Sequence, residues 1–117
     1  MGQNRNKILQ LMISNLVNAV VHKVLEETVK EEILRDHYNQ EGLISLDVAK
    51  RYREKINPVQ RGLPEKDLEK IKEEVLRKAK KELRLRVSKG YQEIDLSLAD
   101  KVLEEVLLEL RIENEKE

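Results

Sequence analysis

The sequence predicts an all-α protein that folds as an irregular four-helix up-and-down bundle with a long N-terminal helix. Apolar residues recur at helical spacing along most of the 117 residues, which indicates amphipathic helices. Charged residues make up 39% of the chain and are mostly Lys, Arg and Glu, all strong helix formers. Three tyrosines are the only large aromatic residues, so the core must be aliphatic, as suits helices packed side by side.

The first helix is expected to run from Lys7 to about Tyr38, a stretch that contains neither Gly nor Pro. Its first half is apolar over more than half of its circumference, which requires packing partners on two sides. Its second half keeps only a narrow apolar stripe among glutamates. Residues 39–42 are expected to end the helix, because Gly42 supplies the backbone freedom that helix ends often use.

A short second helix is expected between Gly42 and about Lys55. Ser45 or Asp47 could accept a backbone N–H as its N-cap. Residues 56–64 are predicted to form a loop, because they contain two prolines and the residue before a proline is pushed out of the helical region.

The third and fourth helices fill the rest of the chain. The third is expected from Pro64, which suits a first helical turn, to about Ser88. The last begins near Ser97, which stands three residues before Asp100 at the spacing of a capping box. The whole chain is expected to form a single domain. Frayed tails are expected at residues 1–6 and 113–117.

Two short sequence patterns that each occur twice, called the sequence echoes below, raise the question of a duplicated helical hairpin. The sequence VKEEILR at 29–35 recurs as IKEEVLR at 71–77, and Gly42 with Asp47 recurs as Gly90 with Asp95. Duplication would explain both echoes. The two echoes are separated by different distances, however, 42 and 48 residues, and helices rich in Lys and Glu match by chance. Both explanations stay open.

The sequence contains no recognisable catalytic, cofactor-binding or metal-binding set, and we expect a non-enzymatic protein. Without cysteine there is no disulfide, thiolate or cysteine–zinc chemistry. His22 and His37 are fifteen residues apart on one predicted helix, about 22 Å, too far to share a metal.

Pairs of acidic residues at helical spacing are the remaining candidates for chemistry. Glu27 with Glu31 and Glu105 with Glu109 could in principle hold a cation or transfer protons. Because they alternate with Lys and Arg, they are better interpreted as solvated helix faces.

The favoured function is a helical protein–protein interaction or regulatory module, self-associating as a homodimer or binding another protein. Its first helix presents more apolar surface than three other helices, one of them short, could readily cover, and uncovered apolar surface indicates an interface. The predicted contact residues are Ile8, Met12, Leu16, Val20, Val21 and Val24.

The alternative is a nucleic-acid-associated protein that uses the basic segment 77–89. Arg77, Lys80, Lys81 and Arg84 are its candidate contacts with phosphates or with an acidic partner. The segment could equally be a solvated face neutralised by the acidic last helix. The net charge of zero gives no general attraction to nucleic acid.

Residues 8–25 form the most apolar stretch but are interrupted by Ser14, Asn15, Asn18, His22 and Lys23. This pattern fits neither a membrane span nor a signal peptide. We therefore expect no membrane association and a cytoplasmic location. The high usage of charged residues is also compatible with a thermophilic source.

Overall fold

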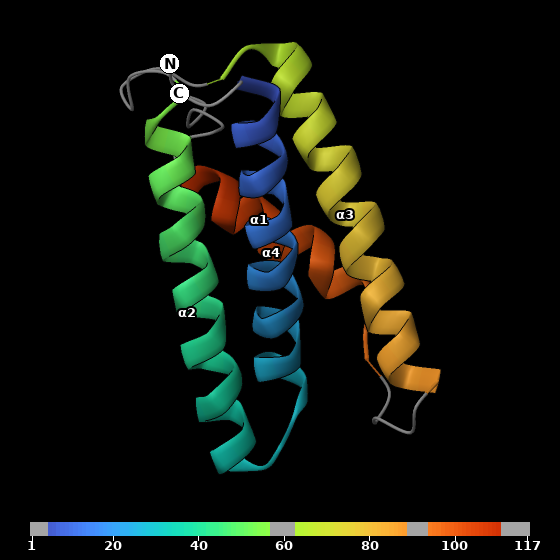
Figure 1. The fold of residues 1–117 in the computed structure, drawn as a ribbon. Coiled ribbons are helices and arrows are strands. Elements are labelled where there is room, and N and C mark those ends of the chain that lie inside the picture. The colour runs from blue at the N-terminus through green and yellow to red at the C-terminus, as the bar shows by residue number, and fades with distance from the viewer. Residues whose placement is uncertain (1–4, 57–62, 89–93, 111–117) are drawn as a thin grey trace.

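A computed structural model describes residues 5–56, 63–88 and 94–110 (Figure 1). Within these ranges the chain forms four helices and no strand, which confirms the all-α prediction. The helices are α1 (Arg5–Thr28), α2 (Glu32–Glu54), α3 (Glu65–Ser88) and α4 (Ser97–Glu109).

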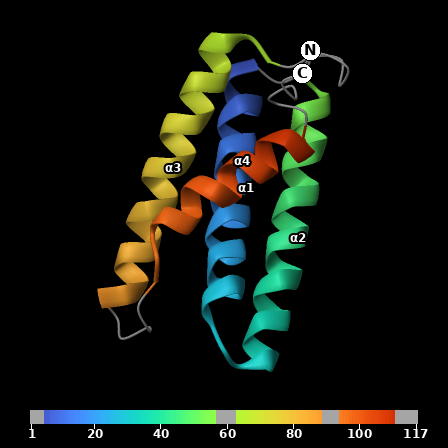
Figure 2. The same cartoon turned by 180° about the vertical axis from the view of Figure 1, so that it is seen from behind.

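In the described part of the chain, α1 is the one helix that contacts all three others. α2 returns antiparallel to α1 on one side, and α3 lies along the opposite side of α1 (Figure 1). α4 crosses one face of this layer obliquely, from the C-terminal end of α3 towards that of α2 (Figure 2). The arrangement is therefore less regular than four aligned helices, and a simple up-and-down bundle is not confirmed.

The first helix ends at Thr28 rather than near Tyr38, so the predicted long helix is two helices. The chain leaves the helical region at Glu31, whose φ of −74° and ψ of 122° are extended. Neither Gly nor Pro marks this break. Its physical reason is tertiary: the turn lets α2 fold back and cover the apolar surface of α1, and this burial outweighs local helix propensity.

Gly42 does not end a helix, because α2 continues through it. The predicted short helix is the second half of α2, and Ser45 and Asp47 lie inside it rather than at an N-cap. A Cβ atom added to Gly42 would lie 3.5 Å from His22 Cβ and 3.8 Å from the Ala19 carbonyl oxygen. Gly42 therefore marks a close approach of α2 to α1.

The third and fourth helices begin close to where the sequence places them. Pro64 directly precedes α3, and α4 starts at Ser97. The cap of α4 differs from the prediction, because Asp95 Oδ1 accepts hydrogen bonds from the Ser97 backbone N–H at 2.9 Å and the Ser97 hydroxyl at 2.6 Å. These bonds lower the pKa of Asp95. Asp100 instead pairs with Lys80.

The two copies of the sequence echo occupy different settings. Residues 29–35 span the α1–α2 connection and the start of α2, whereas 71–77 lie within α3. Gly42 is inside a helix, and Gly90 lies outside the described residues. Duplication is thus not confirmed. Of the predicted tails, residues 5 and 6 belong to α1, while 1–4 and 113–117 are outside the described ranges.

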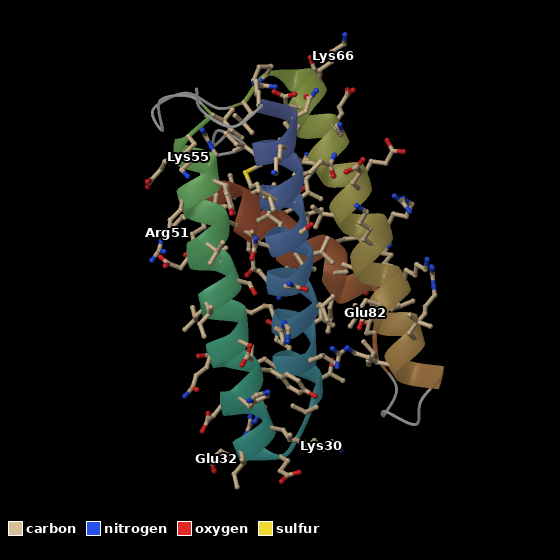
Figure 3. All side chains as sticks on the ribbon, viewed as in Figure 1. Lys30, Glu32, Arg51, Lys55, Lys66 and Glu82 are labelled. Carbon is tan, nitrogen blue, oxygen red and sulfur yellow. The ribbon has the colours of Figure 1, made fainter. Side chains whose placement is uncertain are left out.

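The core is aliphatic, as predicted, and α1 contributes most to it. Ten residues of α1 are buried, and α3 and α4 add Ile, Val, Leu and Ala side chains. Charged side chains such as Lys55 and Lys66 point outward (Figure 3). Among the described residues, Arg53 is the one buried charged side chain, with 1% of its surface exposed. This burial lowers its pKa.

Candidate functional site

The six residues predicted to form a dimer contact are buried within the chain. Their expected exposure is wrong for a physical reason: the turn at 29–31 creates a second helix of 23 residues, which covers the apolar surface that the predicted short helix could not cover. α3 and α4 cover the rest of α1. The residues, with their exposed fractions, are Ile8 (8%), Met12 (0%), Leu16 (0%), Val20 (0%), Val21 (2%) and Val24 (0%).

Exposed apolar side chains are concentrated on α2 instead. Among the described residues, six large apolar side chains are exposed, and four of them lie on this helix. The sequence does not reveal them, because Leu43 and Ile44 stand before the predicted N-cap at Ser45 or Asp47 rather than within a helix. The four are Ile33 (76%), Ile44 (61%), Leu43 (58%) and Leu34 (39%).

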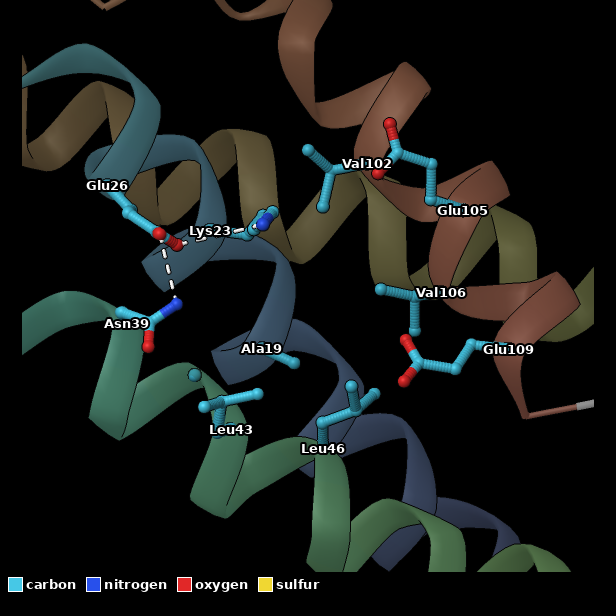
Figure 4. Close-up of a pocket in the computed structure, with 11 residues that line it drawn as sticks. Ala19, Lys23, Glu26, Asn39, Leu43, Leu46, Val102, Glu105, Val106 and Glu109 are labelled. Carbon is cyan, nitrogen blue, oxygen red and sulfur yellow. Dashed lines mark hydrogen bonds and ion pairs between the residues drawn. The ribbon is translucent and has the colours of Figure 1, made fainter.

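A groove with a volume of about 150 Å³ lies between α2 and α4, with α1 at its base (Figure 4). Leu43 and Leu46 line it from α2, and Val102 and Val106 line it from α4. Gly42 also lines the groove, and its missing side chain helps to leave the space open. A space of this size can hold a group of about six carbon atoms, and the four Leu and Val side chains give it an apolar part. It therefore matches one large aliphatic side chain.

The rim of the groove is acidic, because three glutamates and one lysine line it. Glu26 accepts a hydrogen bond from Asn39 at 3.0 Å and lies 3.8 Å from Lys23 Nζ. Glu109 is 3.9 Å from Lys50 Nζ on α2. Glu105 forms no ion pair within the described part of the chain.

The basic residues predicted on α3 separate into two groups. Lys80 is mostly covered and lies 3.2 Å from Asp100 on α4. Arg77, Lys81 and Arg84 are exposed, and none of them pairs with an acid among the described residues. The acidic last helix therefore neutralises the inner side of this segment and leaves its outer side positive.

The two histidines are much closer than the sequence analysis placed them. Their ring centroids lie 5.9 Å and 5.7 Å from that of Tyr38, so they are within about 12 Å of each other. The estimate of 22 Å assumed one straight helix, whereas the α1–α2 turn brings His22 and His37 together around Tyr38. His22 Nδ1 also hydrogen-bonds the Asn18 carbonyl at 2.7 Å.

The acidic pairs have different settings. Glu27 and Glu31 lie on either side of the α1–α2 turn and are exposed. Glu105 and Glu109 line the groove one helical turn apart. Within residues 5–56, 63–88 and 94–110, no three His, Asp or Glu side chains are grouped so as to hold a metal ion.

α1 is long and apolar enough to cross a membrane by length and composition alone. However, 56% of its most apolar window is buried inside the protein. A core helix passes the same test, so this feature is weak evidence for a membrane span.

Comparison with known proteins does not identify a relative. No family model matches the chain, and neither a curated protein nor a solved structure matches it.

Proposed function

We propose that this protein is a non-enzymatic helical interaction module that self-associates. The observation that supports this proposal is the set of four exposed apolar side chains on α2, where Ile33 is 76% and Ile44 is 61% exposed. Fully burying one such side chain stabilises a complex by about 1.5–3 kcal/mol. The contact surface therefore lies on the outside of α2 rather than on the buried face of α1. The cytoplasmic location expected from the sequence stays a prediction.

The charge of the chain is compatible with contact between two copies. Its 23 basic and 23 acidic residues cancel, so two copies do not repel each other through a net charge. A net charge near zero favours association in general, and the α2 surface would make that association specific.

Sedimentation equilibrium over a range of protein concentrations tests the proposal. We expect the average mass to rise above that of one chain, 13.8 kDa, and to return towards it in an α2 variant with Ile33, Leu43 and Ile44 replaced by Gln. The control variant carries Arg35→Gln, Asp36→Asn and Glu41→Gln on the same helix and should still associate. A single-chain mass for the wild type at every concentration would rule out self-association.

Nucleic-acid binding is the second candidate, supported by the outward positive side chains of Arg77, Lys81 and Arg84. Binding through these residues should weaken steeply with added salt, because phosphate contacts release counterions. Fluorescence anisotropy with labelled RNA and DNA at low salt measures it. Replacing the three residues by Gln should abolish binding, whereas replacing Arg51 on α2 and Lys55 at its C-cap should not. No binding of the wild type at low salt would remove this candidate.

A further inference from the structure

The ion pairs among the described residues leave Glu105 on α4 and a set of basic side chains on α3 without ionic partners. Lys72 pairs with Glu104 at 3.5 Å and Lys80 with Asp100 at 3.2 Å, and both pairs join the two helices. The acidic rim of the groove, with Glu105 unpaired among the described residues, lies on the side of α4 that faces α2. Arg77, Lys81 and Arg84 on α3 remain without an acidic partner in the described part of the chain.

These two surfaces cannot meet within one chain. The buried residues Val75, Ala79 and Leu83 mark the side of α3 that faces the core. Arg77, Lys81 and Leu85 each follow one of these buried residues by two positions. A side chain two positions further along an α-helix is rotated by about 200° around the helix axis, so these three point away from the core. The groove lies between α4 and α2. Within the described residues α3 does not contact α2, because α1 lies between them (Figure 2).

The outward surface of α3 also carries an apolar side chain of the right size. Leu85 is 47% exposed and follows Lys81 by one helical turn. We call Arg77, Lys81, Arg84 and Leu85 the basic face. Its spacing matches the groove, because Arg77 and Lys81 are four residues apart, as are Glu105 and Glu109, a separation of about 5–6 Å on a helix.

We infer that self-association places the basic face of one copy in the α2–α4 groove of the next copy. Leu85 enters the groove beside Leu43, and the cations of the basic face lie against Glu105 and, next to Lys50, against Glu109. This inference rests on the proposed self-association and specifies its contact. The interface joins two different surfaces, and each copy carries both of them. Assembly therefore continues into a closed ring or an open chain of copies rather than stopping at two.

Two variants that each destroy one of the surfaces test this arrangement. The face variant is Lys81→Gln with Leu85→Gln, and the groove variant is Leu43→Gln with Glu105→Gln. Both alter exposed side chains, and circular dichroism should show unchanged helicity. Each variant alone should lose the rise in mass that the wild type shows in sedimentation equilibrium.

Mixing the two variants at equal concentration should restore association, but only as complexes of two chains. The face variant supplies an intact groove, the groove variant supplies an intact basic face, and the remaining two surfaces are inactive. As a matched control, Lys101→Gln with Leu108→Gln removes one exposed cation and one exposed apolar side chain of α4 that do not line the groove. This control should associate like the wild type.

The outcomes separate this inference from the proposed function. If a variant with Ile33→Gln and Ile44→Gln is monomeric while the face and groove variants still associate, the protein self-associates through another part of α2 and the inference is wrong. If the mixture fails to associate under conditions where the wild type does, the inference is also wrong. A wild type that is monomeric at every concentration overturns both. Loss of RNA binding in the face variant, with its mass unchanged, would assign the basic face to nucleic acid and overturn the inference.

Discussion

Replacing Gly42 by alanine should stabilise the protein by about 0.5–1 kcal/mol, because Gly42 lies inside α2 and glycine is unfavourable within a helix. The added Cβ would lie 3.5 Å from His22 Cβ and 3.8 Å from the Ala19 carbonyl oxygen. Both distances are ordinary van der Waals contacts, so no clash opposes the gain. Had Gly42 ended a helix in the left-handed conformation, alanine would cost about 1–2 kcal/mol. The two interpretations thus differ in sign.

Urea denaturation followed by circular dichroism measures this difference, with the midpoint shifting at constant slope. For a chain of this length the melting temperature should rise by roughly 2–4 °C. Gln40, an exposed residue two positions earlier on α2, provides the reference. The stability difference between Gln40→Ala and Gln40→Gly measures the helix preference without any packing contribution.

A destabilised Gly42→Ala variant would refute this reasoning, provided that the Gln40 pair shows the usual advantage of alanine. That result would mean that the backbone at Gly42 is not helical, or that α1 and α2 approach more closely than the structure shows. An increase equal to that of the Gln40 pair would confirm that the helix–helix contact has room for a methyl group.

Three other perturbations test the core, a helix cap and an ion pair. Leu16→Ala should lower the free energy of unfolding by about 2–5 kcal/mol, since Leu16 is fully buried; unchanged stability with weaker self-association would instead place Leu16 at an interface. Asp95→Ala should lower the melting temperature at neutral pH, because the Ser97 hydrogen bonds stabilise the Asp95 carboxylate and depress its pKa in the folded state. This stabilisation is present above the unfolded-state pKa of 3.8. It is lost as the pH falls through the folded-state pKa. Melting curves at several pH values should show the difference narrowing in acid, and a difference that stays constant would contradict this cause. A double-mutant cycle with Lys80→Gln and Asp100→Asn should give a coupling below about 1 kcal/mol, since the pair is partly exposed, and a much larger coupling would show that solvent does not screen it.

The helical class, the aliphatic core and the starts of α3 and α4 could be predicted because their signals are local. Helical spacing of apolar residues is a property of one segment at a time. Pro64 acts on the residues beside it. The buried Ile71, Val75 and Leu83 could be read directly from their spacing along α3. The basic residues of α3 were also identified, because charge is visible without a fold.

The turn after Thr28 and the passage of α2 through Gly42 could not be predicted, because no local signal opposes the alternative. Residues 29–31 would continue a helix in isolation. Glycine is more often found at the end of a helix than inside one at a contact with a second helix. What decides both features is the burial of α1, whose apolar surface is covered only if the chain folds back at this point.

By itself, the sequence determined that this protein is helical, that its core is aliphatic and that its first segment must be covered on several sides. Only the tertiary structure decided that the chain covers this segment itself, with α2, and so moved the exposed apolar surface from α1 to α2. It also created the acidic groove from Leu43 and Glu105, which are far apart in sequence and belong to helices that come together only across α1. The physical reason is that periodicity shows which face of a helix must be buried, whereas its partner depends on how distant segments pack.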